Sequence, residues 1–393
     1  MGLAALAPLV QPRTARCTRR NVRFAPGALT PSALPEKACD QSVRGVSGLR
    51  RRTVKSRTRI AAAAAGLVAV AGLAGCSEPG AADADADGAA GGPLTVYTSE
   101  PQAKIDELVA AFTAANPDIE VEVFRAGTGD LTARIEAERT TGAIGADVLL
   151  AADAPTFERY KSDGLLAQFT PADVDALDPS VVDPDGYYVG TRIIPTVIAY
   201  NTNAVDAPPT SWQDLTDPAY RGAITMPNPD VSGAAAYNTA VWLETPELGE
   251  QWLESLVANE PVVAESNGPV GQAVAAGTQP IGIVVDYLVR ELAAKGSPIA
   301  LSYPTDGVPY VAQPAGIFAD SDNQDAAQRF VDFLVSARGQ SLAVEQQYLP
   351  VRDDVGTPEG APALADLPLL DPDPKEITAV QQEAVRKFDD LVG

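Results

Sequence analysis

The chain has 393 residues, with 29 Lys and Arg against 52 Asp and Glu, three cysteines and no histidine. The formal net charge of −23 repels nucleic acid and anionic lipid headgroups, so both are excluded as partners. Without histidine the chain lacks the commonest general base and nitrogen ligand for metals, which excludes most hydrolases and zinc proteins. We therefore expect no catalytic residue, no metal site and no cofactor.

The N-terminal part is basic and ends in an apolar segment. Residues 1–49 contain Pro, Arg and Ser without periodicity, which predicts disorder or a translation start placed too early. Residues 50–75 are basic, then apolar, then small, which is the order of a secretory signal peptide. Their apolar run is too short and too rich in Ala and Gly for a spanning helix, which needs about 20 apolar residues.

The signal peptide ends in Leu73-Ala-Gly-Cys76, which resembles the lipobox of bacterial lipoproteins. The resemblance implies a lipid on Cys76 that anchors the protein to the outer face of the cell membrane. An ordinary signal peptide followed by a chance cysteine is the alternative. Cys17 and Cys39 precede this point, so the exported part has no second cysteine for a disulfide.

The sequence from Cys76 onward is strongly acidic. Residues 1–75 hold 13 basic and 2 acidic side chains, which leaves 16 basic and 50 acidic ones and a charge of about −34. Residues 76–92 are Ala, Gly, Asp and Glu with little to bury, and we expect an acidic flexible linker. The remaining 300 or so residues are enough for two domains.

Alternating strand and helix patterns begin at residue 94. Strands are predicted at residues 94–97, 119–124 and 146–150, with helices between them. Ser99 and Gln102 have the spacing of a capping box at the start of the first helix. Three strands with intervening helices predict a parallel sheet covered on both faces.

A second set of elements follows residue 188. Strands are predicted at residues 188–200, 222–225 and 281–285, the last of which ends at Asp286-Tyr287. Helices are predicted at residues 155–164, 212–215, 233–242, 250–257, 267–277, 325–334 and 376–391. The whole pattern is that of an α/β protein.

Several phrases, in this order, resemble the solute-binding proteins of ATP-driven importers, in the two-lobed group with ferric-, phosphonate-, sugar-phosphate- and thiamine-binding members. These phrases are Leu94-Thr-Val-Tyr97, Ala146-Asp-Val148, Met226-Pro to Ser232-Gly233, Val274-Ala-Ala-Gly277, Phe330-Val-Asp-Phe-Leu334 with Gly339-Gln340, and Tyr348-Leu-Pro-Val-Arg352. The resemblance implies a two-lobed periplasmic-binding-protein fold of type II. Each lobe would be a mixed, mainly parallel sheet flanked by helices.

The resemblance also implies the domain organisation and the partners. Residues 93–197 and 305–352 would form lobe 1, and residues 198–304 and 353–393 lobe 2. Two hinge strands near residues 195–200 and 303–309 would join them. The protein would be a monomer that captures a small-molecule solute and delivers it to a membrane permease and its ATPase.

The nature of the solute depends on the residues at the predicted cleft. Ferric-binding relatives use His, Glu and paired Tyr at the positions of Pro101, Ala152 and Asp286-Tyr287, so a ferric site retains one tyrosine. Helix N-termini hold phosphate or phosphonate through free N–H groups, which favours an organic anion. The residues expected at such N-termini are Ser99, Thr128, Gly129, Ser232, Gly233 and Asn267.

Two further residues are expected to contact the ligand, and alternatives remain open. Asp286 would receive an ammonium group of the solute, and Tyr287 would stack on the solute or donate its hydroxyl hydrogen. Ser99 and Ser232 are equally explained as helix caps, and Asp286 as a solvated strand end. Ferric iron remains the alternative solute, and a scaffolding lipoprotein or an enzyme on the same fold is the alternative function.

Overall fold

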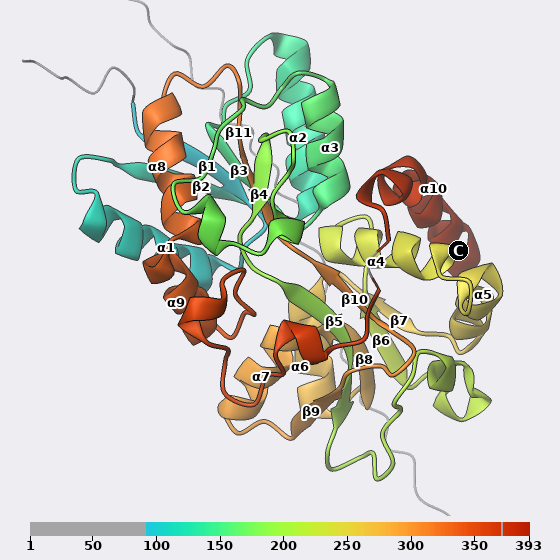
Figure 1. Cartoon of the computed structure of the whole chain (residues 1–393). Coiled ribbons are helices and arrows are strands. Elements are labelled where there is room, and N and C mark those ends of the chain that lie inside the picture. Colours follow the sequence, from blue (N-terminus) through green and yellow to red (C-terminus); the bar gives the residue numbers. More distant parts are fainter. Residues whose placement is uncertain (1–91, 371) are drawn as a thin grey trace, which may run out of the picture. The chain divides into compact units, whose positions relative to one another are not determined.

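The computed structural model describes residues 92–370 and 372–393, which belong to one unit, Asp83–Gly393. The predicted signal peptide, Cys76 and the linker up to residue 91 lie outside the described residues. Strands and helices alternate along the described chain (Figure 1). Its helices include none that is both long enough and apolar enough to cross a membrane.

The strands are β1 Leu94–Thr98, β2 Val121–Arg125, β3 Val148–Leu150, β4 Tyr188–Gly190, β5 Ile194–Asn201, β6 Ile224–Pro227, β7 Val262–Ala264, β8 Ile281–Val285, β9 Ile299–Ser302, β10 Val308–Val311, β11 Pro314–Ile317 and β12 Leu369–Leu370. The α-helices are α1 Gln102–Ala115, α2 Thr128–Thr141, α3 Ala154–Ser162, α4 Gly233–Glu244, α5 Gly249–Ala258, α6 Asn267–Ala276, α7 Asp286–Ala294, α8 Gln324–Val335, α9 Ala337–Glu345 and α10 Pro374–Val392.

The first sheet has the strand order β2-β1-β3-β11-β4. Strand β1 is parallel to β2 and β3, whereas β11 runs antiparallel to β3 and β4. Because side chains alternate along a strand, Val96 packs with Ile105 and Phe112 of α1, and Tyr97 packs with Leu131 of α2 on the other face. The predicted sheet with both faces covered is confirmed, and we call it with α1, α2, α3, α8 and α9 lobe 1.

The second sheet has the order β12-β10-β5-β8-β6-β7, with β9 paired to β5. Strand β5 is antiparallel to β8, β9 and β10, and β6 is parallel to β7 and β8. The buried rings of Trp212, Trp242 and Trp252 pack on one another at centroid distances of 5.0–6.4 Å and form much of the core on one face. We call this sheet with α4, α5, α6, α7 and α10 lobe 2.

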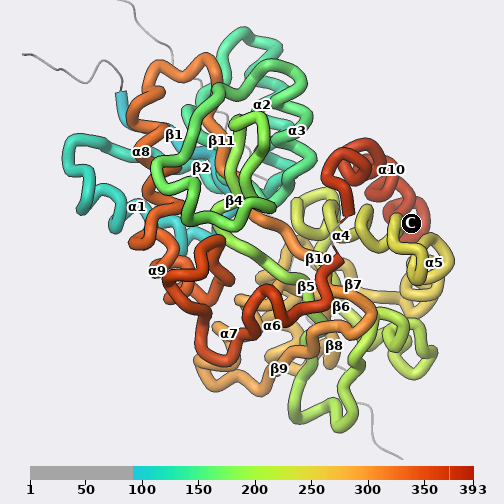
Figure 2. Tube along the Cα trace, in the orientation of Figure 1, coloured from blue at the N-terminus to red at the C-terminus, as the bar shows by residue number. Residues whose placement is uncertain are grey.

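The chain passes between the two sheets at three places, which Figure 2 follows along the backbone. The first passage is residues 191–193 between β4 and β5, the second is 312–313 between β10 and β11, and the third lies between α9 and β12. The single strand predicted at 188–200 is therefore two strands in different sheets. Its apolar pattern continues through the change of sheet, so the predicted hinge at 195–200 falls inside β5.

Candidate functional site

A cavity of about 290 Å³ lies between the lobes. It is bordered by the loops that follow β1, β2 and β3 in lobe 1 and by the N-terminal ends of α4 and α6 in lobe 2. Ligands of α/β proteins bind beyond the carboxyl ends of parallel strands, which is where these loops lie. The predicted residues that line it are Ser99, Thr128, Ser232, Gly233, Asn267 and Tyr287.

Three helices begin at this cavity. Helix α2 begins at Thr128 in lobe 1, and α4 and α6 begin at Gly233 and Asn267 in lobe 2. The first N–H groups of a helix have no partner within the helix and carry partial positive charge, so they attract an anion. Both lobes therefore present N–H groups of helix N-termini to one space.

The two N-termini of lobe 2 are held together by side chains. Ser232 caps α4 by accepting a hydrogen bond from Ala235 N at 3.3 Å, and it accepts a second from Asn267 Nδ2 at 3.2 Å. Asn267 Oδ1 in turn accepts from Val285 N at 3.3 Å. Ser232 is thus a helix cap and a cavity residue at once, so the two interpretations from sequence are compatible.

Two cationic side chains that the sequence did not single out also line the cavity. Lys104 Nζ donates to Gln346 O at 2.7 Å and pairs with Glu291 at 3.3 Å, so its charge is neutralised across the lobes. Arg125 Nε donates to Glu100 O at 3.1 Å. No carboxylate of the described residues lies within pairing distance of the Arg125 guanidinium. Arg125 thus brings uncompensated positive charge to the cavity.

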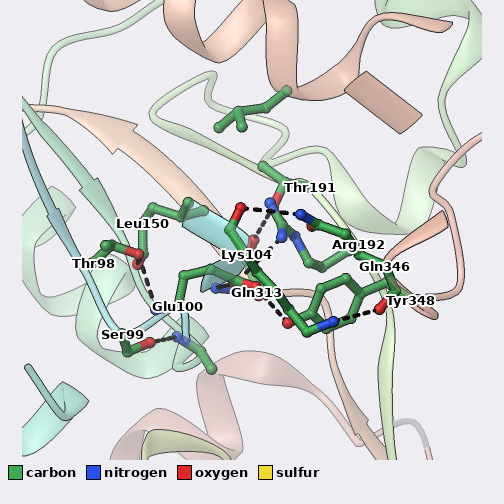
Figure 3. A network of polar contacts seen from close by, with 12 residues as sticks. Thr98, Ser99, Glu100, Lys104, Leu150, Thr191, Arg192, Gln313, Gln346 and Tyr348 are labelled. Atoms are coloured by element: carbon green, nitrogen blue, oxygen red, sulfur yellow. Dashed lines mark hydrogen bonds and ion pairs between the residues drawn. The ribbon is translucent and has the colours of Figure 1, made fainter. Parts of the chain in front are cut away.

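A buried polar network forms the wall where the chain changes lobes (Figure 3). The Glu100 carboxylate accepts from Gln313 Nε2 at 2.8 Å and from the hydroxyl of Tyr348, and it pairs with Arg192 Nη1 at 3.3 Å. Arg192 lies in the first passage, Gln313 in the second and Tyr348 in the third. Glu100 therefore joins the cavity to all three passages. Apart from Tyr348, which begins the phrase Tyr348-Leu-Pro-Val-Arg352, no sequence motif marks these residues, since they meet only through the fold.

Tyr287 faces Tyr348 across the cavity wall, with ring centroids 4.3 Å apart. Burial, followed by the charge of Glu100, raises the pKa of both phenols well above the usual range. Lys104 Nζ lies 5.1 Å from both ring centroids. The two hydroxyls are therefore protonated near neutral pH, and that of Tyr348 donates a hydrogen bond to Glu100.

Asp286 does not line the cavity, in contrast to its predicted role. It is fully buried at the start of α7, where its carboxylate pairs with Arg290 at 2.6 Å and accepts from Tyr303 at 3.0 Å. Burial raises its pKa in spite of the Arg290 charge. The sequence showed a carboxylate at the end of a buried strand, but it could not show that a helix begins there and turns the side chain inward. Asp286 is therefore not placed to receive a ligand ammonium.

Ser99 and Gly129 also differ in detail from their predicted roles. Helix α1 begins at Gln102 after Pro101 without a side-chain cap, so the capping box is wrong, and Ser99 Oγ accepts from Ala152 N at 3.3 Å. Gly129 lies outside the cavity lining, and its N–H donates to Val231 O of the opposite lobe at 3.4 Å. Gly129 thus contacts the opposite lobe through its backbone.

Comparison with known families agrees with this geometry. A family profile described as bacterial extracellular solute-binding protein matches residues 144–374, more than half of the chain. The chain belongs to this family. The predicted solute-binding component of an importer and the two-lobed fold are thereby confirmed, and the family is one of transport proteins.

Individual relatives of this solute-binding protein carry different names. The present chain is 26% identical over 277 residues to the iron uptake protein A1 of Synechocystis, and the match covers 65% of this chain and 74% of that protein. It is 27% identical over 264 residues to a putative 2-aminoethylphosphonate-binding periplasmic protein of Salmonella typhimurium, covering 62% and 73%.

Solved structures show the same fold. The periplasmic binding protein AfuA of Actinobacillus pleuropneumoniae, with fructose-6-phosphate bound, has a TM-score of 0.70 and 24% identity and covers 76% of this chain and 98% of its own. Iron-bound HitA of Pseudomonas aeruginosa has a TM-score of 0.67 and 24% identity, covering 76% and 99%. Within the described residues, no group of three or more His, Cys, Asp or Glu is arranged to hold a metal ion.

Proposed function

We propose that this solute-binding protein captures a small organic anion with a phosphonate or phosphate group in the cavity between its lobes. The observation that supports the proposal is the convergence of three helix N-termini, from both lobes, on the space that Arg125 also lines. Backbone N–H groups and one guanidinium are sufficient to bind a phosphonate without a metal. Relatives named for 2-aminoethylphosphonate and for fructose-6-phosphate support the same class of solute.

Capture depends on closure of the lobes around the solute. An anion that contacts Thr128 of lobe 1 and Ser232 of lobe 2 stabilises the closed form, because those contacts exist together only when the lobes meet. The closed form then delivers the solute to a permease and its ATPase. We include in the proposal that the protein acts as a monomer, tethered by a lipid on Cys76, without a catalytic step.

Ferric iron is the second candidate, because relatives are named for iron and because two tyrosines face each other at the cavity. Fe(III) prefers anionic oxygen ligands. The raised pKa of both phenols and the Lys104 ammonium beside them oppose tyrosinate formation and the binding of a trivalent cation. The cavity also has far more room than a bare ion needs. The organic anion is the better fit.

Isothermal titration calorimetry of the full chain separates these candidates. The panel is 2-aminoethylphosphonate, fructose-6-phosphate, inorganic phosphate, thiamine and ferric citrate. We expect saturable binding of a phosphonate or phosphate ester and no visible charge-transfer band with ferric salts. A ferric band that disappears in Tyr287→Phe would establish iron as the solute. Turnover of a bound compound would indicate an enzyme, and failure to bind any compound would favour a scaffold.

A further inference from the structure

The cavity between the lobes has a polar wall at the helix N-termini. Thr128 begins α2, and Ser266 precedes α6 without accepting a capping hydrogen bond from that helix. Both line the cavity, together with the exposed Arg125. Helix N–H groups, hydroxyls and a guanidinium all donate hydrogen bonds to an anion. The phosphonate or phosphate group of the solute is therefore expected at this wall.

The charged side chains elsewhere in the cavity are already paired with protein groups. Lys104 forms an ion pair with Glu291 across the lobes at 3.3 Å, and Glu291 also accepts from Lys295 at 2.6 Å. Glu100 is held by the network at the lobe passages (Figure 3). A hydroxyl or ammonium group of a solute must break one of these contacts or stay without a partner, and either lowers its affinity.

Apolar side chains form most of the remaining wall. Pro101 and Ala103 contribute from lobe 1, and Val231 and Leu288 contribute from lobe 2. Each of the four keeps exposed surface, so a solute in the cavity can reach it. Leu288 lies in the first turn of α7 and packs on the hydrophobic cluster that contains Ile194. Each methylene group that a solute buries against such a wall raises its affinity about fourfold.

We infer that the solute is a phosphonate or phosphate ester with an apolar body, which Leu288, Val231 and Pro101 cover when the lobes close. The inference rests on the proposed function and narrows it. Solutes whose body carries hydroxyl or ammonium groups, such as sugar phosphates and aminoalkylphosphonates, bind less tightly than an apolar compound of the same size. An apolar contact thus replaces the ammonium contact that the sequence placed at Asp286.

Three phosphonates test the inference: methylphosphonate, propylphosphonate and 2-aminoethylphosphonate. The last two have the same chain length and differ in the terminal group, which is a methyl or an ammonium. In calorimetry with the full chain, propylphosphonate should bind about tenfold or more tightly than either of the others. In Leu288→Asn, which keeps the approximate size of the side chain and makes it polar, the preference for propylphosphonate over 2-aminoethylphosphonate should fall by about threefold or more.

Leu292→Asn is the matched control. Leu292 lies one turn further along α7, is half-buried and packs on the same hydrophobic cluster, but it lies outside the cavity lining. It should retain the wild-type preference, and because ratios within one protein are compared, a general loss of affinity does not obscure the result.

Two results overturn the apolar body and leave the proposed function standing. One is binding of 2-aminoethylphosphonate by the wild type as tightly as propylphosphonate, or more tightly. The other is a preference that Leu288→Asn leaves unchanged or that Leu292→Asn lowers equally. Failure of all three compounds to bind overturns both the inference and the proposed function.

Discussion

Gly129 permits the close contact between lobes, and Gly129→Ala should therefore weaken solute binding without unfolding the protein. A Cβ at this position would lie 1.9 Å from Asp230 O of the opposite lobe, whereas ordinary contacts begin at 3.4 Å. The Asp230 oxygen belongs to the backbone and a Cβ has no rotamer that could move it away, so the lobes would have to separate locally by about 1.5 Å. The hydrogen bond from Gly129 N to Val231 O would then be lost as well.

The expected loss of solute affinity follows from the steric clash and the lost hydrogen bond. A lost hydrogen bond costs about 0.5–1.5 kcal/mol, and steric repulsion adds to it, so affinity should fall by about tenfold or more. In the open form the new methyl group meets no opposing lobe. There Ala in the first turn of α2 favours the helix by about 0.5–1 kcal/mol over Gly. The solute-free protein should therefore melt at the same temperature or slightly higher.

Calorimetry gives the affinity, and thermal unfolding without solute gives the stability. Gly92→Ala is a control, since a Cβ there meets nothing within 4 Å, and it should bind solute as the wild type does. Wild-type affinity in Gly129→Ala would show that the lobes bind solute without this contact. A lower melting temperature in the absence of solute would show that Gly129 acts on folding rather than on closure.

Three further substitutions test separate parts of the site. Arg125→Gln should reduce phosphonate affinity about tenfold to a hundredfold, which is the value of a charge-assisted hydrogen bond. The melting temperature should change little, because Arg125 is exposed. Unchanged affinity in calorimetry would show that Arg125 does not belong to the site. Asp286→Ala should lower the free energy of unfolding by about 3–5 kcal/mol, because it leaves the mostly buried Arg290 guanidinium without a carboxylate. The folded protein should keep its affinity, and weaker solute binding alone would restore Asp286 to the site. Burial raises the pKa of Asp153, so its contribution to stability is present below the unfolded-state pKa and is lost as pH rises through the folded-state pKa. The stability of Asp153→Asn relative to wild type should thus increase as pH rises above about 4, the unfolded-state pKa of Asp, in urea unfolding, and a constant difference would contradict the raised pKa.

The sequence predicted strands β1, β2, β3, β6 and β8 and most of the helices, because strand and helix periods depend on local residues. It did not predict the short strands β7, β9, β10, β11 and β12 or helix α9. The passages between lobes were less predictable. Residues 188–200 form a continuous apolar pattern, and nothing local shows that Tyr188 and Ile194 belong to different sheets. Helix α7 was also missed, so Asp286 was taken for a strand end exposed to ligand.

The residues of the candidate site likewise fall into those that the sequence could predict and those that it could not. Thr128, Ser232 and Asn267 could be predicted because each stands at a helix start that the sequence marks with small or capping residues. Glu100 and Gln313 could not, since they are 213 positions apart and meet only where the chain changes lobes. A glutamine in a loop gives no sign of the distant carboxylate that it will contact.

The function proposed for the cavity is to bind an organic anion that contains a phosphonate or phosphate group. Its most direct test is calorimetric titration of the full chain with 2-aminoethylphosphonate, in the presence and absence of ferric citrate. We expect saturable binding of one molecule per chain that ferric citrate does not change. Saturable binding of ferric citrate with no heat from the phosphonate, or competition between the two, would contradict it.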